Sequence, residues 1–289
     1  MIDHDLAERD EHEHDEDEDG DYSRVDAGAK VAQFHATGTG VRRIGYPIHV
    51  TRGTVVRRVE VTPSMLRLTV GGPEFADFES HQADDHVKVV FAFPDGTRSD
   101  PVVNDDLELD WPRPHPPARK YTVRRYDATT CEVDLDVVVH PGGLASEWAS
   151  GVEVGDEVVL AGPPGAQAFA QTYDHYVLAA DPTGLPAVAR WIEESPADVS
   201  ADVYVDTDHD HERTYPLAQR AGVRVTWLDR SDGSVLADRV MATLPRPGTF
   251  PFAAGEAGDI KPLRRWVKQH GVDSLIAGYW KRGVADLDE

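Results

Sequence analysis

The segment Arg119-Lys120-Tyr121-Thr122-Val123-Arg124 places a guanidinium, an aromatic ring and a hydroxyl within one short run of strand-forming residues. Because side chains alternate along a strand, Arg119 and Tyr121 share one face, whereas Thr122 and Arg124 share the other. A guanidinium can hold a phosphate in bidentate fashion, and a phenol ring can lie against a flat heterocycle. A solvated edge strand is the alternative interpretation, and the surrounding segments decide between the two.

Short strands surround this segment on both sides. Six are predicted from runs of β-forming residues that end in turn residues, at 55–61, 65–70, 86–93, 121–126, 132–140 and 157–161. Helical periodicity is almost absent between them, and their spacing predicts a small antiparallel barrel. One short helix is predicted at 144–150.

The pattern changes after Tyr173, where apolar strands begin to alternate with helices. Strands are predicted at 176–180, 202–206, 223–228, 250–254 and 274–280, and helices at 185–194 and beyond residue 257. This alternation predicts a parallel α/β sheet, in which ligands bind at the carboxyl ends of the strands. We therefore expect a β-barrel domain at 46–168 and a nucleotide-binding α/β domain at 169–289.

Negative charge is concentrated at the start of the chain. The 289 residues carry a formal charge of −23, of which residues 1–22, with twelve acidic side chains against one arginine, contribute −11. We expect residues 1–45 to form an acidic disordered tail. Its His4, His12 and His14 lack the fixed geometry of a metal site, so a solvating tail is the preferred interpretation. The remaining charge of −12 disfavours nucleic acid and anionic lipid as partners.

The composition also bounds the class of protein. No apolar run approaches the roughly 18 residues of a membrane span, and the first residues lack the features of a signal peptide. Cys131 is the only cysteine, which excludes an intramolecular disulfide and a cysteine-held iron–sulfur cluster. A nucleophilic hydrolase is unsupported because no G-x-S-x-G sequence occurs. We expect a cytoplasmic monomer that does not insert into membranes.

Two segments combine small residues with a predicted helix start. They are His140-Pro141-Gly142-Gly143-Leu144-Ala145-Ser146-Glu147-Trp148-Ala149 and Ala180-Asp181-Pro182-Thr183-Gly184-Leu185-Pro186-Ala187. Small residues let backbone N–H groups approach a phosphate, and the helix dipole favours the anion. For the first segment, an ordinary capped helix is the alternative.

Cations occur at two places in otherwise apolar or acidic surroundings. Lys88 follows Asp84-Asp85-His86-Val87 on a predicted apolar strand, so its ammonium must reach a barrel end or an anionic ligand, unless it snorkels to solvent. Lys281 and Arg282 lie within residues 278–283 and add positive charge that the acidic body lacks.

In this order, the segments resemble the ferredoxin-reductase superfamily and, in detail, the siderophore-interacting proteins, which are FAD-dependent ferric-siderophore reductases. The resemblance runs from about Tyr46 to Gly283. The resemblance rests on five motifs. They are R-x-Y-T-x-R at 119–124, the helix start at 140–149, D-D-H-x-K at 84–88, A-G-E-A at 254–257 and G-Y-W at 278–280. Four positions depart from the family pattern and put side-chain contacts to the cofactors there in doubt: Pro164, Ala166, Ala180 and Pro182.

The resemblance implies which residues bind the cofactors and the substrate. Arg119 is implied to bind the FAD pyrophosphate, Tyr121 to pack on the isoalloxazine, and Thr122 to hydrogen-bond the polar edge of the flavin. The implied cofactor-binding residues are Arg119, Tyr121, Thr122, Arg124, His140, Gly143, Ala145, Ser146, Asp181, Thr183 and Glu256. The implied substrate-binding residues, for an anionic ferric chelate, are Lys88, Lys281 and Arg282. Arg124 shares a strand face with Thr122 and is implied to bind either the flavin or the ferric chelate.

The implied reaction is hydride transfer from NAD(P)H to FAD, followed by single-electron reduction of siderophore-bound Fe(III) to Fe(II), without a catalytic acid or base or a protein metal ligand. Asp206 ends a predicted strand, with Asp208 and Asp210 beyond it, which favours NADH slightly because a carboxylate there accepts ribose hydroxyls. A solvated acidic loop is the alternative. Two other functions remain open: the same flavoprotein with ferredoxin as its electron donor, and a non-enzymatic siderophore or iron carrier that uses the acidic tail.

Overall fold

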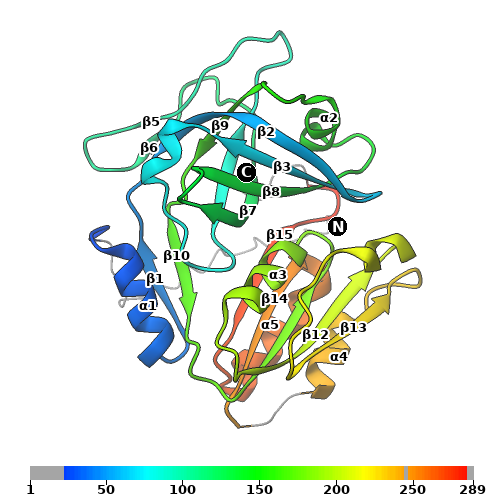
Figure 1. The fold of residues 1–289 in the computed structure, drawn as a ribbon. Helices are drawn as coiled ribbons and strands as arrows, with labels where there is room; N and C mark the ends of the chain where they lie inside the picture. Colours follow the sequence, from blue (N-terminus) through cyan, green and yellow to red (C-terminus); the bar gives the residue numbers. More distant parts are fainter. Residues whose placement is uncertain (1–22, 244–246, 285–289) are drawn as a thin grey trace, which may run out of the picture.

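The computed structural model describes residues 23–243 and 247–284, and its first large unit is a closed antiparallel barrel (Figure 1). The strands, in the barrel order β2-β3-β8-β7-β4-β9, are β2 Val50–Thr62, β3 Met65–Gly71, β8 Glu132–Val138, β7 Ala118–Asp127, β4 His86–Val90 and β9 Glu157–Ala161. All six predicted strands are present, so the predicted barrel is confirmed. β2 and β7 are longer than predicted, and β4 and β8 are shorter.

One apolar cluster fills the barrel because alternate strand residues point inward. Val87 and Val89 of β4 lie in this cluster with Val123 and Leu135, and all four are fully buried. Helix α2 (Leu144–Gly151) closes one end of the barrel through Ala145 and Ala149. The Trp148 ring of this helix packs edge-on against Phe91, with the ring centres 5.2 Å apart.

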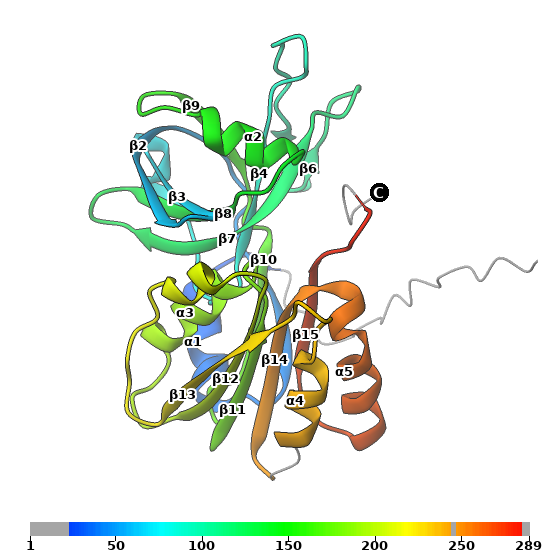
Figure 2. The same ribbon diagram turned by 90° about the vertical axis from the view of Figure 1, so that its right-hand side faces the viewer.

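The second large unit is a five-stranded parallel sheet in the order β13-β12-β11-β14-β15, as the alternation predicted. The strands are β11 His175–Ala180, β12 Ser200–Thr207, β13 Val223–Asp229, β14 Thr249–Glu256 and β15 Leu275–Trp280. Helix α3 (Leu185–Glu194) covers one face, and α4 (Leu236–Thr243) and α5 (Ala257–His270) cover the other (Figure 2). β11 therefore contributes Leu178 to one apolar layer and Val177 to the other.

The prediction of a disordered tail over residues 1–45 is wrong for its last part. Helix α1 (Ala27–Thr37) and strand β1 (Val41–Gly45) are ordered, and β1 pairs antiparallel with β10 (Gly165–Phe169). Ala27, Val31 and Ile44 are buried in one cluster there. Small and apolar residues at helical spacing form this cluster, and the charge of the preceding residues masked the pattern. Residues 1–22, with their histidines, and residues 285–289 lie outside the described part of the chain.

The two large units are joined by polar contacts between α3 and β7. The guanidinium of Arg190 on α3 donates to the carbonyl oxygen of Val123 at 3.0 Å and to the Ser80 hydroxyl at 2.7 Å. Arg124 of β7 forms a two-pronged ion pair with Glu193 of α3, at 2.6 and 2.8 Å. These contacts fix the strand that carries the predicted flavin residues against the nucleotide-type sheet.

The remaining elements are short. They are η1 Pro73–Asp77, the two-stranded sheet of β5 Val102–Val103 and β6 Leu109–Asp110, and η2 Asp210–Thr214 between β12 and β13. Among the helices of the described residues, none has the length and apolar character needed to cross a membrane.

Candidate active site

Strand β7 changes partners at the segment that carries the predicted flavin residues. From Ala118 to Thr122 it pairs with β4, and its pairing with β8 begins only at Val123 opposite Leu135. The stretch with Arg119 and Tyr121 therefore lies where β8 has already turned away toward α2.

The turn from β8 into α2 is held by its own side chains. The Ser146 hydroxyl donates to the carbonyl oxygen of His140 and accepts from the His140 N–H, both at 2.7 Å. The His140 ring lies against Gly143, where a Cβ would collide with it. Ala145 is buried in the barrel core. Three of these residues thus shape the turn, and a pocket of ≈ 620 Å³ opens beside it.

The start of α2 offers backbone donors in that turn. The first N–H groups of a helix have no intrahelical partner, and the positive end of the helix dipole favours an anion. The Glu147 N–H is the first to bond back, to the Gly143 carbonyl at 2.8 Å, so the N–H groups of the preceding residues remain outside the helical ladder. This geometry fits a phosphate group.

The environment of Tyr121 and Thr122 suits contact with a neutral ring. Tyr121 packs against the barrel core, and burial raises its pKa, so the phenol stays protonated at physiological pH. Thr122 is nearly buried, and it lies opposite His86 of β4. The Arg119 guanidinium donates to the Ala118 carbonyl at 2.6 Å, which keeps it beside the strand.

A buried acidic turn adjoins Thr122. Asp85 accepts hydrogen bonds from the N–H groups of His81 and Gln82, at 2.7 and 2.9 Å, and from the Tyr46 hydroxyl at 3.0 Å. Burial, reinforced by Asp85, raises the pKa of Asp84 to about 7. Within the described residues, Asp84 Oδ1 is buried without a hydrogen-bond partner.

Strand β15 brings a buried phenol to this place. Burial raises the pKa of Tyr279, and the nearby Asp84 carboxyl adds to that effect, while a hydrogen bond from the Thr122 side chain opposes it. The buried Asp84 oxygen beside this Thr122–Tyr279 pair fits the polar edge of a flavin. The residues present therefore fit FAD.

Arg124 and Lys88, predicted to bind ligands, also make protein contacts. Arg124 is only 5% exposed and its guanidinium is held by Glu193, so it joins the two domains. Its predicted contact with flavin or chelate stays a prediction. The Lys88 ammonium lies 5.2 Å from the centre of the Trp111 ring, within cation–π range.

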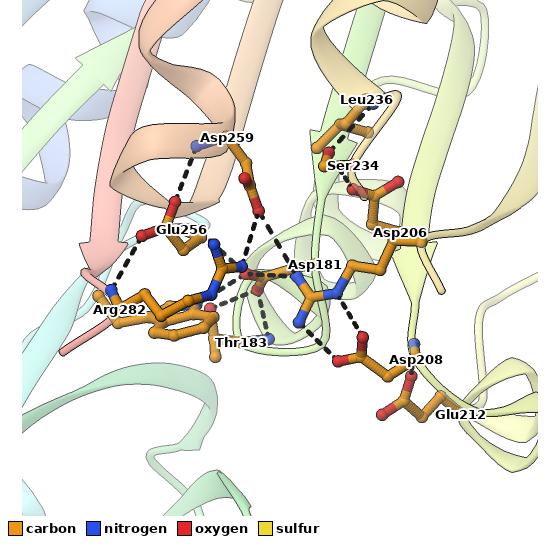
Figure 3. A network of polar contacts seen from close by, with 12 residues as sticks. Asp181, Thr183, Asp206, Asp208, Glu212, Ser234, Leu236, Glu256, Asp259 and Arg282 are labelled. Atoms are coloured by element: carbon orange, nitrogen blue, oxygen red, sulfur yellow. Dashed lines mark hydrogen bonds and ion pairs between the residues drawn. The ribbon is translucent and has the colours of Figure 1, made fainter. Parts of the chain in front are cut away.

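The turn after β11 is built around Asp181. Its Oδ1 accepts from the N–H and hydroxyl of Thr183, at 2.8 and 2.6 Å, and its Oδ2 accepts from the Glu256 N–H and the Trp280 indole, at 2.9 and 2.7 Å (Figure 3). A Cβ on Gly184 would come within 2.5 Å of the Ala254 carbonyl oxygen, so this position requires glycine. Asp181 thus locks together the carboxyl ends of β11, β14 and β15.

Glu256 caps helix α5 and ties down the end of the chain. Its Oε2 accepts from the Asp259 N–H at 2.8 Å, and its Oε1 accepts from the Arg282 N–H at 2.9 Å (Figure 3). Although burial opposes it, these donors lower the pKa of Glu256. The Arg282 guanidinium lies 3.4 Å from Asp259, and Lys281 is exposed beside it. Lys281 and Arg282 therefore lie together at the end of β15.

Arg230 is the principal residue that the sequence interpretation missed at this edge. It follows β13 and pairs with Asp208 at 2.6 and 2.8 Å, while its Nη1 lies 3.8 Å from Asp181 and 3.9 Å from Asp259. Its position directly after a strand of the parallel sheet was the available signal.

Two of the three carboxylates expected near the ribose hydroxyls, Asp206 and Asp208, are engaged by other side chains. Asp208 is bound by Arg230, and Asp206 is buried and accepts from the Ser234 hydroxyl. Burial raises the pKa of Asp206 to about 6. The preference for NADH therefore stays a prediction. Within the described ranges, no group of three His, Cys, Asp or Glu side chains could hold a metal ion.

Comparison with known proteins agrees with this arrangement. The family model of the siderophore-interacting FAD-binding domain matches residues 54–167, and that of the siderophore-interacting protein matches residues 173–283. The chain is 31% identical to an NADPH-dependent ferric-chelate reductase of Escherichia coli K12, over 78% of this chain and 91% of the relative. It is 30% identical to the ferric vibriobactin reductase ViuB of Vibrio cholerae, over 79% of this chain and 88% of the relative.

Solved structures show the same fold. A siderophore utilization protein from T. fusca superposes with a TM-score of 0.79 at 36% identity, and covers 85% of this chain and 98% of its own. A ferredoxin NADP+ reductase from Neisseria gonorrhoeae superposes with a TM-score of 0.56 at 12% identity, and the match covers 80% of this chain and 99% of that reductase. At this identity the likeness shows the fold alone. The fold is thus that of the ferredoxin reductases, and on its sequence the chain belongs to the siderophore-interacting protein family.

Proposed function

We propose that this protein is a flavin-dependent ferric-siderophore reductase, in which electrons from NAD(P)H pass through FAD to siderophore-bound Fe(III). The observation that carries the proposal is the change of partner on β7. Arg119, Tyr121 and Thr122 lie on the stretch of β7 that pairs with β4 before the pairing with β8 begins, and β8 leads on to α2. We propose that a dinucleotide with a flat ring system binds along this stretch.

Each of these residues has a distinct task in the proposal. Arg119 and the first N–H groups of α2 bind the pyrophosphate, because both present donors to an anion. The neutral Tyr121 ring packs on the flavin, and Thr122 orients its polar edge. Bound FAD would supply the ability to take up two electrons together and release them singly.

The ferric chelate is proposed to bind between the cations of the two domains. Lys88 of β4 and Lys281 and Arg282 after β15 would attract an anionic chelate to an otherwise acidic protein. No acid or base is required at the iron, since the step is an electron transfer. Fe(II) binds hard oxygen ligands less tightly than Fe(III), so reduction releases the metal.

NAD(P)H is proposed to bind at the carboxyl ends of β11 and β14, beside the Asp181 turn. The names of the relatives support a nicotinamide donor. Ferredoxin is the second candidate donor. Five carboxylates surround Arg230 and Arg282 at this edge, which opposes an anionic dinucleotide. They are Asp181, Asp206, Asp208, Glu256 and Asp259.

Two measurements test the proposal in sequence. The purified protein, or the protein mixed with FAD, should show the two visible absorption bands of a bound flavin. Anaerobic addition of NADPH or NADH should bleach them, and a ferric siderophore should restore them while a ferrous chelator develops colour. Failure to bind FAD would exclude the function; binding without bleaching would point to a ferredoxin donor.

A further inference from the structure

The acidic turn before β4 places two neighbouring carboxyl groups in different surroundings. Asp85 Oδ2 accepts four hydrogen bonds at 2.7 to 3.1 Å. The donors are the N–H groups of His81 and Gln82 and the hydroxyls of Tyr46 and Ser80. By contrast, Asp84 Oδ1 is buried and accepts no hydrogen bond within residues 23–243 and 247–284. Because hydrogen bonds favour the charged form of a carboxyl group, the turn stabilises a charge on Asp85 better than one on Asp84.

The charged groups around the pair favour the same division. Burial raises the pKa of both carboxyl groups, and Arg190 of α3 opposes this at each of them. With burial, the neighbouring Asp85 raises the pKa of Asp84 to about 7. The phenol of Tyr279 on β15 also lies near Asp84, and burial keeps it protonated. Two neighbouring buried carboxyl groups do not readily carry charge together, so Asp84 is the one that keeps a proton.

The same turn is bonded directly to the strand of the proposed flavin site. The Asp85 carbonyl oxygen accepts from the Val123 N–H of β7 at 2.7 Å, and β4 begins opposite Thr122. The Tyr279 phenol is hydrogen-bonded by the Thr122 side chain and lies near Asp84. Asp84 Oδ1 is therefore close to the residue that is proposed to orient the polar edge of the flavin.

A residue of α1 holds the side chain of Gln82 at this carboxyl group. The ring Nε2 of His35 lies 2.6 Å from Gln82 Oε1, and an amide oxygen only accepts, so the ring donates. Burial lowers the pKa of His35, which keeps the ring neutral at physiological pH. The amide nitrogen is then the Gln82 donor available to Asp84, and the Gln82 side chain lowers the pKa of that carboxyl group. His35 lies outside the segments that the family models match, 54–167 and 173–283.

We propose that Asp84 binds the polar edge of the flavin as a neutral carboxylic acid, positioned by Gln82 and His35; this rests on the proposed function. The O–H of Asp84 would donate to a carbonyl oxygen or an unprotonated ring nitrogen of the flavin. That edge presents mostly acceptors, so a carboxylic acid suits it and a carboxylate repels it. Affinity for FAD is therefore full while Asp84 is protonated, and it falls as the pH rises above about 7.

The dependence of FAD affinity on pH tests this without turnover. Titration of the apoprotein with FAD, followed by quenching of the flavin fluorescence, gives the Kd at pH 6.5 and at pH 8.5. For the parent we expect the Kd to rise about tenfold over this range, because the carboxyl group ionises within it. Asp84→Asn keeps a donor but cannot ionise. Its Kd should lie within about threefold of the parent value at pH 6.5 and stay constant to pH 8.5.

Gln82→Met removes the proposed positioning contact at similar side-chain length. Because Gln82 lowers the pKa of Asp84, this variant should shift the rise in Kd to higher pH, which a merely structural loss of affinity would not do. Asp95→Asn, on an exposed turn, is the matched control and should follow the parent profile. A parent Kd that does not rise with pH, or that rises equally in Asp84→Asn, would overturn the role of Asp84. An unshifted Gln82→Met profile would overturn the positioning role of Gln82 and His35. The proposed function fails separately, if no FAD binds at any pH.

Discussion

A single hydrogen-bonding partner changes what an arginine on β7 can do. Arg119 and Arg124 lie five residues apart on the same strand. The Arg119 guanidinium donates to a neighbouring carbonyl, whereas the two terminal nitrogens of Arg124 donate to Glu193. Arg124 therefore contributes to the joint between the domains. Sequence spacing alone could not separate these roles, because Glu193 lies on the other domain.

Replacing Arg119 with alanine tests its proposed role in FAD binding. Charge-assisted hydrogen bonds contribute about 1.5–3 kcal/mol, so we expect the Kd for FAD to rise between about tenfold and a hundredfold. Titration of the apoprotein with FAD measures this. Arg57→Ala removes an exposed arginine on β2 and should bind FAD as the parent does. An unchanged Kd in Arg119→Ala would remove Arg119 from the site.

Replacing Glu193 with glutamine tests the domain joint. The Arg124 side chain is 6% exposed and that of Glu193 is 40% exposed, so the variant leaves a nearly buried cation without its counter-charge. Fully buried pairs cost about 3–5 kcal/mol when broken; partial exposure reduces this to about 2 kcal/mol. Urea unfolding measures the loss. Glu60→Gln, at an exposed position of β2, is the control and should leave the free energy of unfolding almost unchanged.

Asp84 should make stability depend on pH. Its pKa is about 7 in the folded protein against an ordinary value of 3.8, because burial and the neighbouring Asp85 disfavour the charged form. The folded state therefore holds this proton more tightly, so stability is full below pH 4 and is lost as pH rises to about 7. The Asp84→Asn substitution removes the ionisable group and therefore removes this loss of stability at higher pH.

We accordingly expect Asp84→Asn to raise the Tm by several degrees relative to the parent at pH 8, and by much less at pH 5. Thermal unfolding at both pH values measures the difference. Asp95→Asn is the control, since Asp95 is exposed on a turn. An equal Tm difference at the two pH values would show that Asp84 ionises normally.

At the scale of elements, sequence patterns predicted the parts that are locally determined. All six barrel strands and all five sheet strands follow from apolar runs bounded by turn residues. Helix α4 was missed because its eight residues carry only a short apolar face, and α1 because an acidic stretch precedes it. Arg230 was missed for another reason. It meets Asp181 only because the sheet order places β13 near β11, and sequence separation hides that proximity.

The corrected segment 27–45 should contribute to stability. Val31 is 1% exposed in the cluster that joins α1 to β1 and β10. Val31→Asp would bury a carboxylate without a partner, which we expect to cost about 3 kcal/mol or more. Gln33→Asp places the same charge on an exposed position of α1 and serves as the control. Equal urea midpoints for the two variants would mean that α1 does not pack as described.

At the scale of the whole molecule, charge is distributed unevenly between the surfaces proposed to receive the dinucleotide and the chelate. The protein is strongly acidic, and the carboxyl edge of the parallel sheet concentrates carboxylates around Arg230 and Arg282. Lys88 and Lys120 lie opposite each other on the barrel. Under the proposed function, an anionic dinucleotide approaches the acidic edge of the sheet, whereas an anionic chelate approaches the cations proposed to bind it.

Salt should therefore affect the two half-reactions in opposite directions. Raising the ionic strength from about 0.1 M to 1 M shortens the screening length from about 10 Å to about 3 Å. We expect flavin reduction by NADPH to become a few-fold faster at subsaturating donor, because repulsion is screened. Reoxidation by an anionic ferric chelate should become a few-fold slower, because attraction is screened. Anaerobic stopped-flow absorbance at the flavin band measures each step separately.

Asp208→Asn provides the internal comparison, since it removes one carboxylate from the sheet edge and leaves the barrel face intact. Its donor step should depend less on salt than that of the parent, while its chelate step should be unchanged. If both half-reactions slowed with salt in the parent, the dinucleotide would be attracted to its site after all. Arg230 and Arg282 would then outweigh the carboxylates around them as seen by the dinucleotide, and the proposed donor site would be an attractive one.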